Sequence, residues 1–164
     1  MEKEKAYDFS DLRPDPHRRL MEINANRFPI TLVLDRLLEP ANVGMIFRLG
    51  EACRIKRIIF WKMYSTEPSL KAVKVARAAV HQIPFLHVHT VRELQEALPD
   101  SHWVALEYTN RSIPYHQFKA PESLALFVGN AQRGLDPELL TLDRESIHLP
   151  MYGLNTSINV ACAT

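Results

Sequence analysis

Short apolar runs that suit buried strands alternate with segments of helical pattern along most of the chain. The predicted strands are residues 30–34, 57–61, 85–89, 103–108, 124–128 and 147–150, and the predicted helices between them are residues 42–53, 69–81, 91–98 and 137–142. Strands that are apolar along their whole length are typical of a sheet covered on both faces. The alternation therefore predicts one α/β domain with a mostly parallel sheet and helices on both faces.

Length and composition agree with a single globular domain, since the chain has 164 residues, of which 46% are hydrophobic and 24% charged. Residues 1–28 read as a polar N-terminal extension with a short helix at 17–26, and residues 29–164 as the main domain. No apolar stretch reaches the length of a membrane span, and the first residues lack the apolar region of a signal peptide. We therefore expect a cytoplasmic protein.

The two cysteines, Cys53 and Cys162, lie in apolar sequence without the spacing of a metal site. We expect buried free thiols in a reducing compartment, in preference to a disulfide or a zinc site, and no bound metal.

Basic residues concentrate between residues 48 and 89, although the net charge of the whole chain is only +1. This segment contains eight basic residues and only two acidic ones. The basic residues are Arg48, Arg54, Lys56, Arg57, Lys62, Lys71, Lys74 and Arg77, and the acidic residues are Glu51 and Glu67. Within the predicted helix at 69–81, the basic residues recur every three to four positions and form an outward stripe. Such a stripe suits contact with nucleic acid, and equally a solvated helix face.

Three loops, residues 39–48, 128–135 and 149–160, each follow a predicted strand or strand-like run, where open α/β sheets place their ligand crevices. Gly129 and Gly134 in the second loop allow close approach to a ligand, or simply a tight turn. The third loop is rich in polar residues beside an apolar core, and Thr156 or Ser157 could cap a final helix.

The order and spacing of residues in these loops carry more information than any loop alone. The motifs are Asn42-x-Gly44-x-x-x-Arg48, then Gly129-Asn-x-x-x-Gly134-Leu135, then Pro150-Met151-x-Gly153 followed by Ser157-x-Asn159-Val160. Together they resemble the three motifs of the SpoU (TrmH-type) RNA ribose 2′-O-methyltransferases of the SPOUT superfamily. The resemblance covers residues 30–164.

The resemblance implies a SPOUT fold, in which the carboxyl-terminal segment forms a trefoil knot, and a homodimer with residues 42–53 at the interface. It also implies that S-adenosylmethionine is bound at the knot. The implied cofactor-binding residues are Leu126, Val128, Gly129, Asn130, Gly134, Ile147, Leu149, Met151, Ser157, Asn159 and Val160.

By the same resemblance Arg48 is the residue that activates the ribose 2′-hydroxyl, while Asn42, Ser157 and Asn159 orient substrate and loops. A guanidinium stays protonated, so clamping an RNA phosphate is the physically easier role for Arg48. The expected RNA contacts are Arg48, Lys71, Lys74, Arg77, Arg18 and Arg19. We expect tRNA ahead of rRNA as substrate, because no additional RNA-binding module is evident.

The chain departs from the family pattern in two places. The family's Gly-x-Glu has Ala131 at the Glu position, with Gln132 beside it, and the final helix, expected from near Ser157, has room for about two turns before Thr164. Two other functions stay open: an RNA-binding relative that has lost turnover, and an α/β enzyme or nucleotide-binding domain unrelated to RNA.

Overall fold

The computed structural model describes residues 15–63, 67–130, 133–142, 144–155 and 157–164. Ala131, Gln132 and Thr156, which the sequence singled out, lie outside the described residues. The elements are α2 (Pro16–Ala25), β1 (Phe28–Asp35), α3 (Pro40–Ala52), β2 (Ile55–Trp61), α4 (Leu70–Ala76), α5 (Ala79–Gln82), β3 (Phe85–Val88), α6 (Val91–Ala97), β4 (His102–Leu106), β5 (Ile113–Pro114), a 3-10 turn (Tyr115–Gln117), β6 (Leu124–Val128), α7 (Pro137–Leu140), β7 (Glu145–His148) and α8 (Val160–Ala163).

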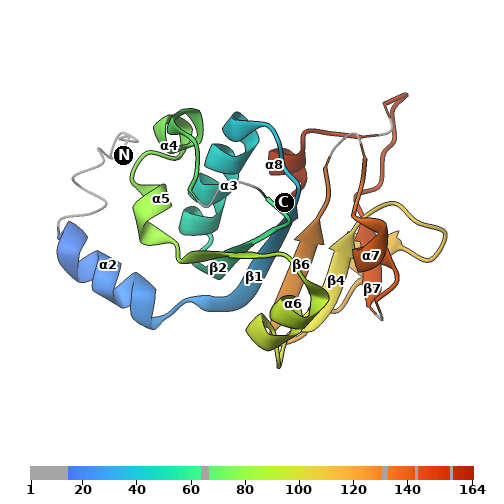
Figure 1. Cartoon of the computed structure of the whole chain (residues 1–164), viewed down its shortest axis with the longest axis horizontal. Helices are drawn as coiled ribbons and strands as arrows, with labels where there is room; N and C mark the ends of the chain where they lie inside the picture. The colour runs from blue at the N-terminus through green and yellow to red at the C-terminus, as the bar shows by residue number, and fades with distance from the viewer. Residues whose placement is uncertain (1–14, 64–66, 131–132, 143, 156) are drawn as a thin grey trace, which may run out of the picture.

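The strands form one seven-stranded sheet in the order β3-β2-β1-β6-β4-β7-β5, and every neighbouring pair is parallel (Figure 1). Parallel pairing puts the carboxyl ends of all strands at one edge, which we call the carboxyl edge. The predicted α/β class with a parallel sheet is confirmed.

Helices cover both faces of the sheet, as the alternation of side chains along β1 makes clear. Leu32 and Leu34 pack into one buried cluster with residues of α3, α4, α5 and α8, whereas Val33 packs into a second cluster with residues of α6 and α7. Neighbouring residues of a strand point to opposite faces, so the two clusters are the two sides of the sheet. The central strands are mostly apolar, as expected for a sheet that is covered on both faces.

The start of α3 follows from local sequence. Pro40 occupies the first helical turn, where its missing N–H costs nothing, and the Glu39 side chain accepts a hydrogen bond from the Ala41 amide. Gly44 lets α3 pack directly on α4, since a Cβ at this position would lie 2.5 Å from the Ala72 carbonyl oxygen. Gly44 is thus required by the packing of the protein itself.

The predicted single helix at 69–81 is wrong, because the structure divides it into α4 and α5. Arg77 ends α4 with a φ of 55°, a conformation that cannot continue a right-handed helix. The chain restarts as α5 and buries Ala79 and Val80 against the sheet. Sequence periodicity alone does not reveal this break.

The last helix also begins later than expected. Asn159, and not Ser157, is the N-cap of α8: its side chain accepts a hydrogen bond from the Ala161 amide at 2.9 Å, while Ser157 is exposed. An Asn at this position satisfies a free amide of the first turn, which fixes where the helix starts.

Both cysteines are free, as expected, but they are exposed and not buried. Cys53 follows the end of α3, and Cys162 lies on the outward side of α8, whose Val160 and Ala161 face the core. In the part of the chain that the structure describes, no helix combines the length and apolar character needed to cross a membrane.

Candidate functional site at the carboxyl edge

The second and third predicted loops meet the carboxyl end of β4 in a cavity of about 180 Å³, which we call the loop cavity. Its lining comprises Leu106, Glu107, Tyr108, Val128, Gly129, Asn130, Gly134, His148, Leu149, Met151, Ser157, Ile158, Val160 and Ala163. Most of the cofactor-binding residues predicted from sequence are among them. Leu126, Ile147 and Asn159 are not, and Leu126 packs instead against the core beside α3.

The sequence prediction missed the contribution of β4. Leu106 is the last residue of this strand, Glu107 and Tyr108 follow it, and all three line the cavity together with the glycine loop. The rule that ligand crevices lie at the carboxyl ends of parallel strands applies to β4 as much as to β6. This rule could have identified residues 106–108 from the sequence, but none of them belongs to one of the three motifs.

The glycine loop after β6 is closed on itself. The Gly134 amide donates to the Asn130 carbonyl at 2.8 Å, and the Asn130 amide donates to the Gly134 carbonyl at 3.2 Å. Gly134 has a φ of 64°, which favours glycine, and a Cβ at Gly129 would lie 2.6 Å from the Gly134 carbonyl carbon. Both glycines are therefore required by the loop's own backbone.

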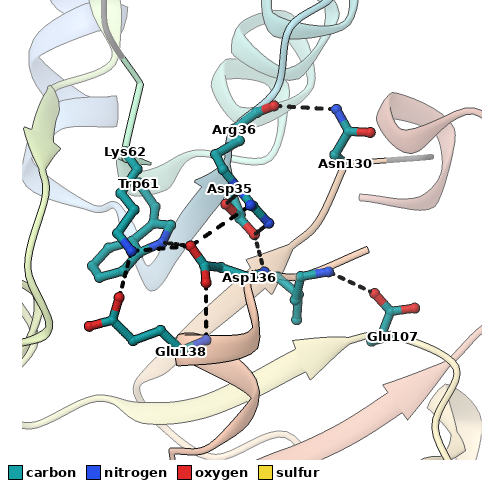
Figure 2. Close-up of polar contacts among 9 residues, drawn as sticks. Asp35, Arg36, Trp61, Lys62, Glu107, Asn130, Asp136 and Glu138 are labelled. Carbon is teal, nitrogen blue, oxygen red and sulfur yellow. Dashed lines mark hydrogen bonds and ion pairs between the residues drawn. The ribbon is translucent and has the colours of Figure 1, made fainter. Parts of the chain in front are cut away.

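A buried carboxylate joins the end of this loop to β1 (Figure 2). Asp35, the last residue of β1, is fully buried; it accepts hydrogen bonds from the Asp136 amide and from the Arg36 guanidinium, the latter at 2.7 Å. Burial raises the pKa of the Asp35 carboxyl, although the hydrogen bonds from Arg36 and Asp136 oppose the shift. The loop is thereby fixed to the centre of the sheet.

Asp136 and Glu107 extend this network to β2 and β4 (Figure 2). The Asp136 carboxylate accepts from the Trp61 indole at 3.3 Å and from the Lys62 ammonium at 3.2 Å. Burial alone would raise the pKa of Asp136, but the hydrogen bonds outweigh it and hold the pKa below its ordinary value. The Glu107 carboxylate accepts from the Leu135 amide at 3.1 Å, so three strands hold the loop.

The first predicted loop reaches the site through Asn42. The Asn159 side-chain amide donates to the Asn42 side-chain oxygen at 2.9 Å, which joins α3 to the segment that lines the loop cavity. Arg48 lies further along α3, is exposed, and does not line the cavity. The structure thus brings Asn42 and Asn159 together and leaves Arg48 apart from both.

The basic residues between 48 and 89 do not form one face. Lys56 lies near the amino end of β2, whereas Lys62 follows its carboxyl end and is ion-paired with Asp136. On α4, Lys71 pairs with Glu39 at 2.8 Å, whereas Lys74 and Arg77 are exposed and have no ion-pair partner among the described residues. Arg18 and Arg19 lie on α2, where both pair with Glu22.

Among the residues that the structure describes, no group of three or more His, Cys, Asp or Glu side chains is arranged to hold a metal ion.

Solved structures share this architecture. An S-adenosylmethionine-bound rRNA methyltransferase from Sinorhizobium meliloti matches with a TM-score of 0.76 at 26% identity, over 88% of this chain and 56% of that one. A TrmH/SpoU tRNA-modifying enzyme from A. aeolicus matches with a TM-score of 0.77 at 20% identity, over 90% of this chain and 77% of that one.

Among curated proteins, the 23S rRNA (guanosine-2′-O-)-methyltransferase RlmB of Salmonella typhi is 31% identical over 142 residues, which are 83% of this chain and 56% of that protein. A similar coverage, 55%, holds for a matching protein of Staphylococcus epidermidis. The chain thus spans little more than half the length of these curated relatives. The model of the SpoU rRNA methylase family matches residues 29–164, which include every residue that lines the loop cavity, and the chain belongs to this family.

Proposed function

We propose that residues 29–164 form an S-adenosylmethionine-dependent RNA ribose 2′-O-methyltransferase domain, preceded by an extension. The observation that carries the proposal is the meeting of the two family loops in the loop cavity, with the first motif tied to it by the bond between Asn42 and Asn159. The named relatives that methylate RNA, and the family that the chain belongs to, support the same activity.

The lining of the loop cavity fits the nucleoside end of the cofactor. Val128, Leu149 and Met151 supply apolar surface for a flat purine ring, and the Glu107 carboxylate supplies acceptors for hydroxyl groups. At about 180 Å³ the cavity is smaller than typical pockets for whole ligands, so the remainder of the cofactor would extend out of it. The bound cofactor supplies an electrophilic methyl group on a sulfonium.

The protein's task in this reaction is positioning. The ribose oxygen forms a bond to the methyl carbon as the carbon–sulfur bond breaks, and the hydroxyl proton passes to an acceptor. Asn42, Ser157 and Asn159 are the side chains that we assign to orienting the ribose. Arg48 is assigned to holding the RNA phosphate beside the reacting hydroxyl, because its guanidinium remains charged.

We also propose that two copies associate through α3. Met45 and Leu49, one turn apart on this helix, are 43% and 37% exposed, and Arg48 lies between them in sequence. Because Arg48 does not line the loop cavity of its own chain, a second copy docked on α3 is the simplest way to bring it to a site. Light scattering should then report a monomer for the double variant Met45→Glu/Leu49→Glu. The control Met21→Glu on α2 should keep the wild-type mass.

The proposed trefoil knot would form where residues 149–159 pass the loop after β6. Two observations support it. The two segments line one cavity. In addition, α8 packs on α3, although β4 and β6 separate β7 from β1 in the sheet, so the chain passes both strands between β7 and α8 (Figure 1). A crystal structure tests it directly, and a terminus that passes outside the preceding loop would refute it.

Methyl incorporation from labelled cofactor into bulk unmodified tRNA and rRNA tests the function, and we expect tRNA to be the better acceptor. Arg48→Ala should abolish incorporation and leave cofactor affinity nearly intact; equal loss of both would refute the assigned role of Arg48. Cofactor binding without incorporation into either RNA would favour a relative that binds RNA without turnover.

A further inference from the structure

A second and larger cavity, of about 570 Å³, lies at the carboxyl edge beside α4, and we call it the α4 cavity. Leu37, Val43, Phe60, Met63 and Ala72 give it an apolar floor. None of them lines the loop cavity, and none belongs to the residues assigned to the cofactor. The volume is in the range of pockets that hold small organic ligands.

The wall of the α4 cavity suits a flat ring with polar edges. The rings of Phe60 and His87, both in the lining, stack with centroids 4.9 Å apart and planes at 25°. The cations Arg36 and Lys62 at the rim are already paired with Asp35 and Asp136, so they offer no excess charge for a phosphate. An aromatic wall with polar groups at the rim is the combination that binds a nucleobase.

The α4 cavity is adjacent to the loop cavity. Asn130 contributes to the lining of both. At the start of α3, Pro40 and Val43 line the α4 cavity, while Asn42 between them bonds to Asn159. A ribose held at Asn42 would therefore lie close to the α4 cavity.

The same helix that closes the cavity presents cations outside it. Ser69 and Ala72 of the α4 segment line the cavity, while Lys74 on that helix and Arg77 directly after it are exposed. Phosphates of an RNA strand on these cations would leave a base free to enter the cavity.

We propose that the α4 cavity receives the nucleobase of the nucleotide whose ribose is methylated. This inference rests on the proposed methyltransferase function, which it extends by naming the subsite that reads the base. Base identity is then sensed by the rim of the α4 cavity, and Arg133 and Glu67, which both belong to its lining, are the side chains placed to do so.

A substitution that fills the cavity tests the proposal by activity. Met63→Trp should lower kcat/KM for RNA by about tenfold or more, because a stacked base contributes at least that much to binding, and should leave cofactor affinity unchanged. The matched control is Met21→Trp. Met21 is exposed on α2 and lines neither cavity. Equal methylation by the two variants would overturn the proposal.

A binding measurement on the wild-type chain is independent of turnover. In protein labelled with [methyl-¹³C]methionine and saturated with S-adenosylhomocysteine, Met63 reports on the α4 cavity and Met151 on the loop cavity. Adding AMP, GMP, CMP or UMP in turn should shift the Met63 signal with at least one of them, by the ring current of the base, and leave Met151 in place. The Met63→Leu variant assigns the signal.

The two proposals fail in different ways. If the wild-type chain transfers no methyl group but Met63 responds to a mononucleotide, the proposed function is wrong and the base site stands. If methyl transfer occurs but Met63 is unmoved by all four mononucleotides, the base site is wrong and the function stands.

Discussion

Gly129→Ala should damage the loop cavity although it adds only one methyl group. The new Cβ would lie 2.6 Å from the Gly134 carbonyl carbon, 2.7 Å from the Leu135 amide nitrogen and 2.8 Å from the Gly134 oxygen. All three are backbone atoms, so no side chain can rotate away. To reach an ordinary contact of 3.4 Å the loop must move by about 0.6–0.8 Å.

The size of the effect follows from that displacement. Overpacking of this kind costs about 1–3 kcal/mol of the free energy of unfolding, which lowers Tm by about 2–12 °C in a domain of this size. The same movement displaces Gly134 and Leu135, whose amides are held by Asn130 and Glu107. Because a misplacement near 1 Å can cost up to about a hundredfold in a positioned site, we expect cofactor Kd to rise at least tenfold.

Thermal unfolding and calorimetric titration with S-adenosylmethionine measure the two effects. Gly153→Ala is the matched control, since a Cβ there meets nothing within 4 Å and Gly153 has no positive φ. It should leave cofactor affinity unchanged and keep or slightly raise Tm, by restricting the unfolded chain. A Gly129→Ala protein with wild-type Tm and affinity would refute the steric reasoning.

Three other changes have defined outcomes. Asp136→Asn should lower the free energy of unfolding by about 1–3 kcal/mol at neutral pH. Because folding lowers the pKa of Asp136, wild type loses this advantage as pH falls from 3.8 through the folded pKa, so denaturation curves of the two proteins should converge in acid. The double variant Lys74→Ala/Arg77→Ala should reduce the slope of the logarithm of the RNA association constant against the logarithm of salt concentration by about 1.4–1.8. The control Lys56→Ala/Lys119→Ala should leave this slope unchanged. An unchanged slope for Lys74→Ala/Arg77→Ala would show that α4 is not part of the RNA-binding surface. Ala131→Glu should leave methyl transfer unchanged or raise it, and a clear decrease would mean that this loop departs from the family arrangement.

The fold was predictable because each central strand contains a mostly apolar run and these runs alternate with segments of helical pattern. β6 was placed to the residue, and the predicted start of α3, Asn42, lies two residues after the observed start at Pro40. The break at Arg77 was not predictable, because a positive φ at an arginine has no sequence signature.

At the site, motif residues identified the glycine loop and the third loop, but not the partners that hold them. Asp35 and Glu107 are single carboxylates at strand ends. Only the parallel register of the sheet puts Asp35 beside Asp136, 101 positions further on, and Glu107 beside Leu135, 28 positions further on. The same holds for the α4 cavity, whose floor is made of core residues that no motif distinguishes.

The bond between Asn42 and Asn159 spans 117 positions of the chain. During synthesis, which proceeds at about 5–20 residues per second, the strands at the centre of the sheet can pair before Asn159 has left the ribosome. A nascent chain therefore has most of its scaffold before the third loop completes the loop cavity, and ligand capture has to follow synthesis of that loop.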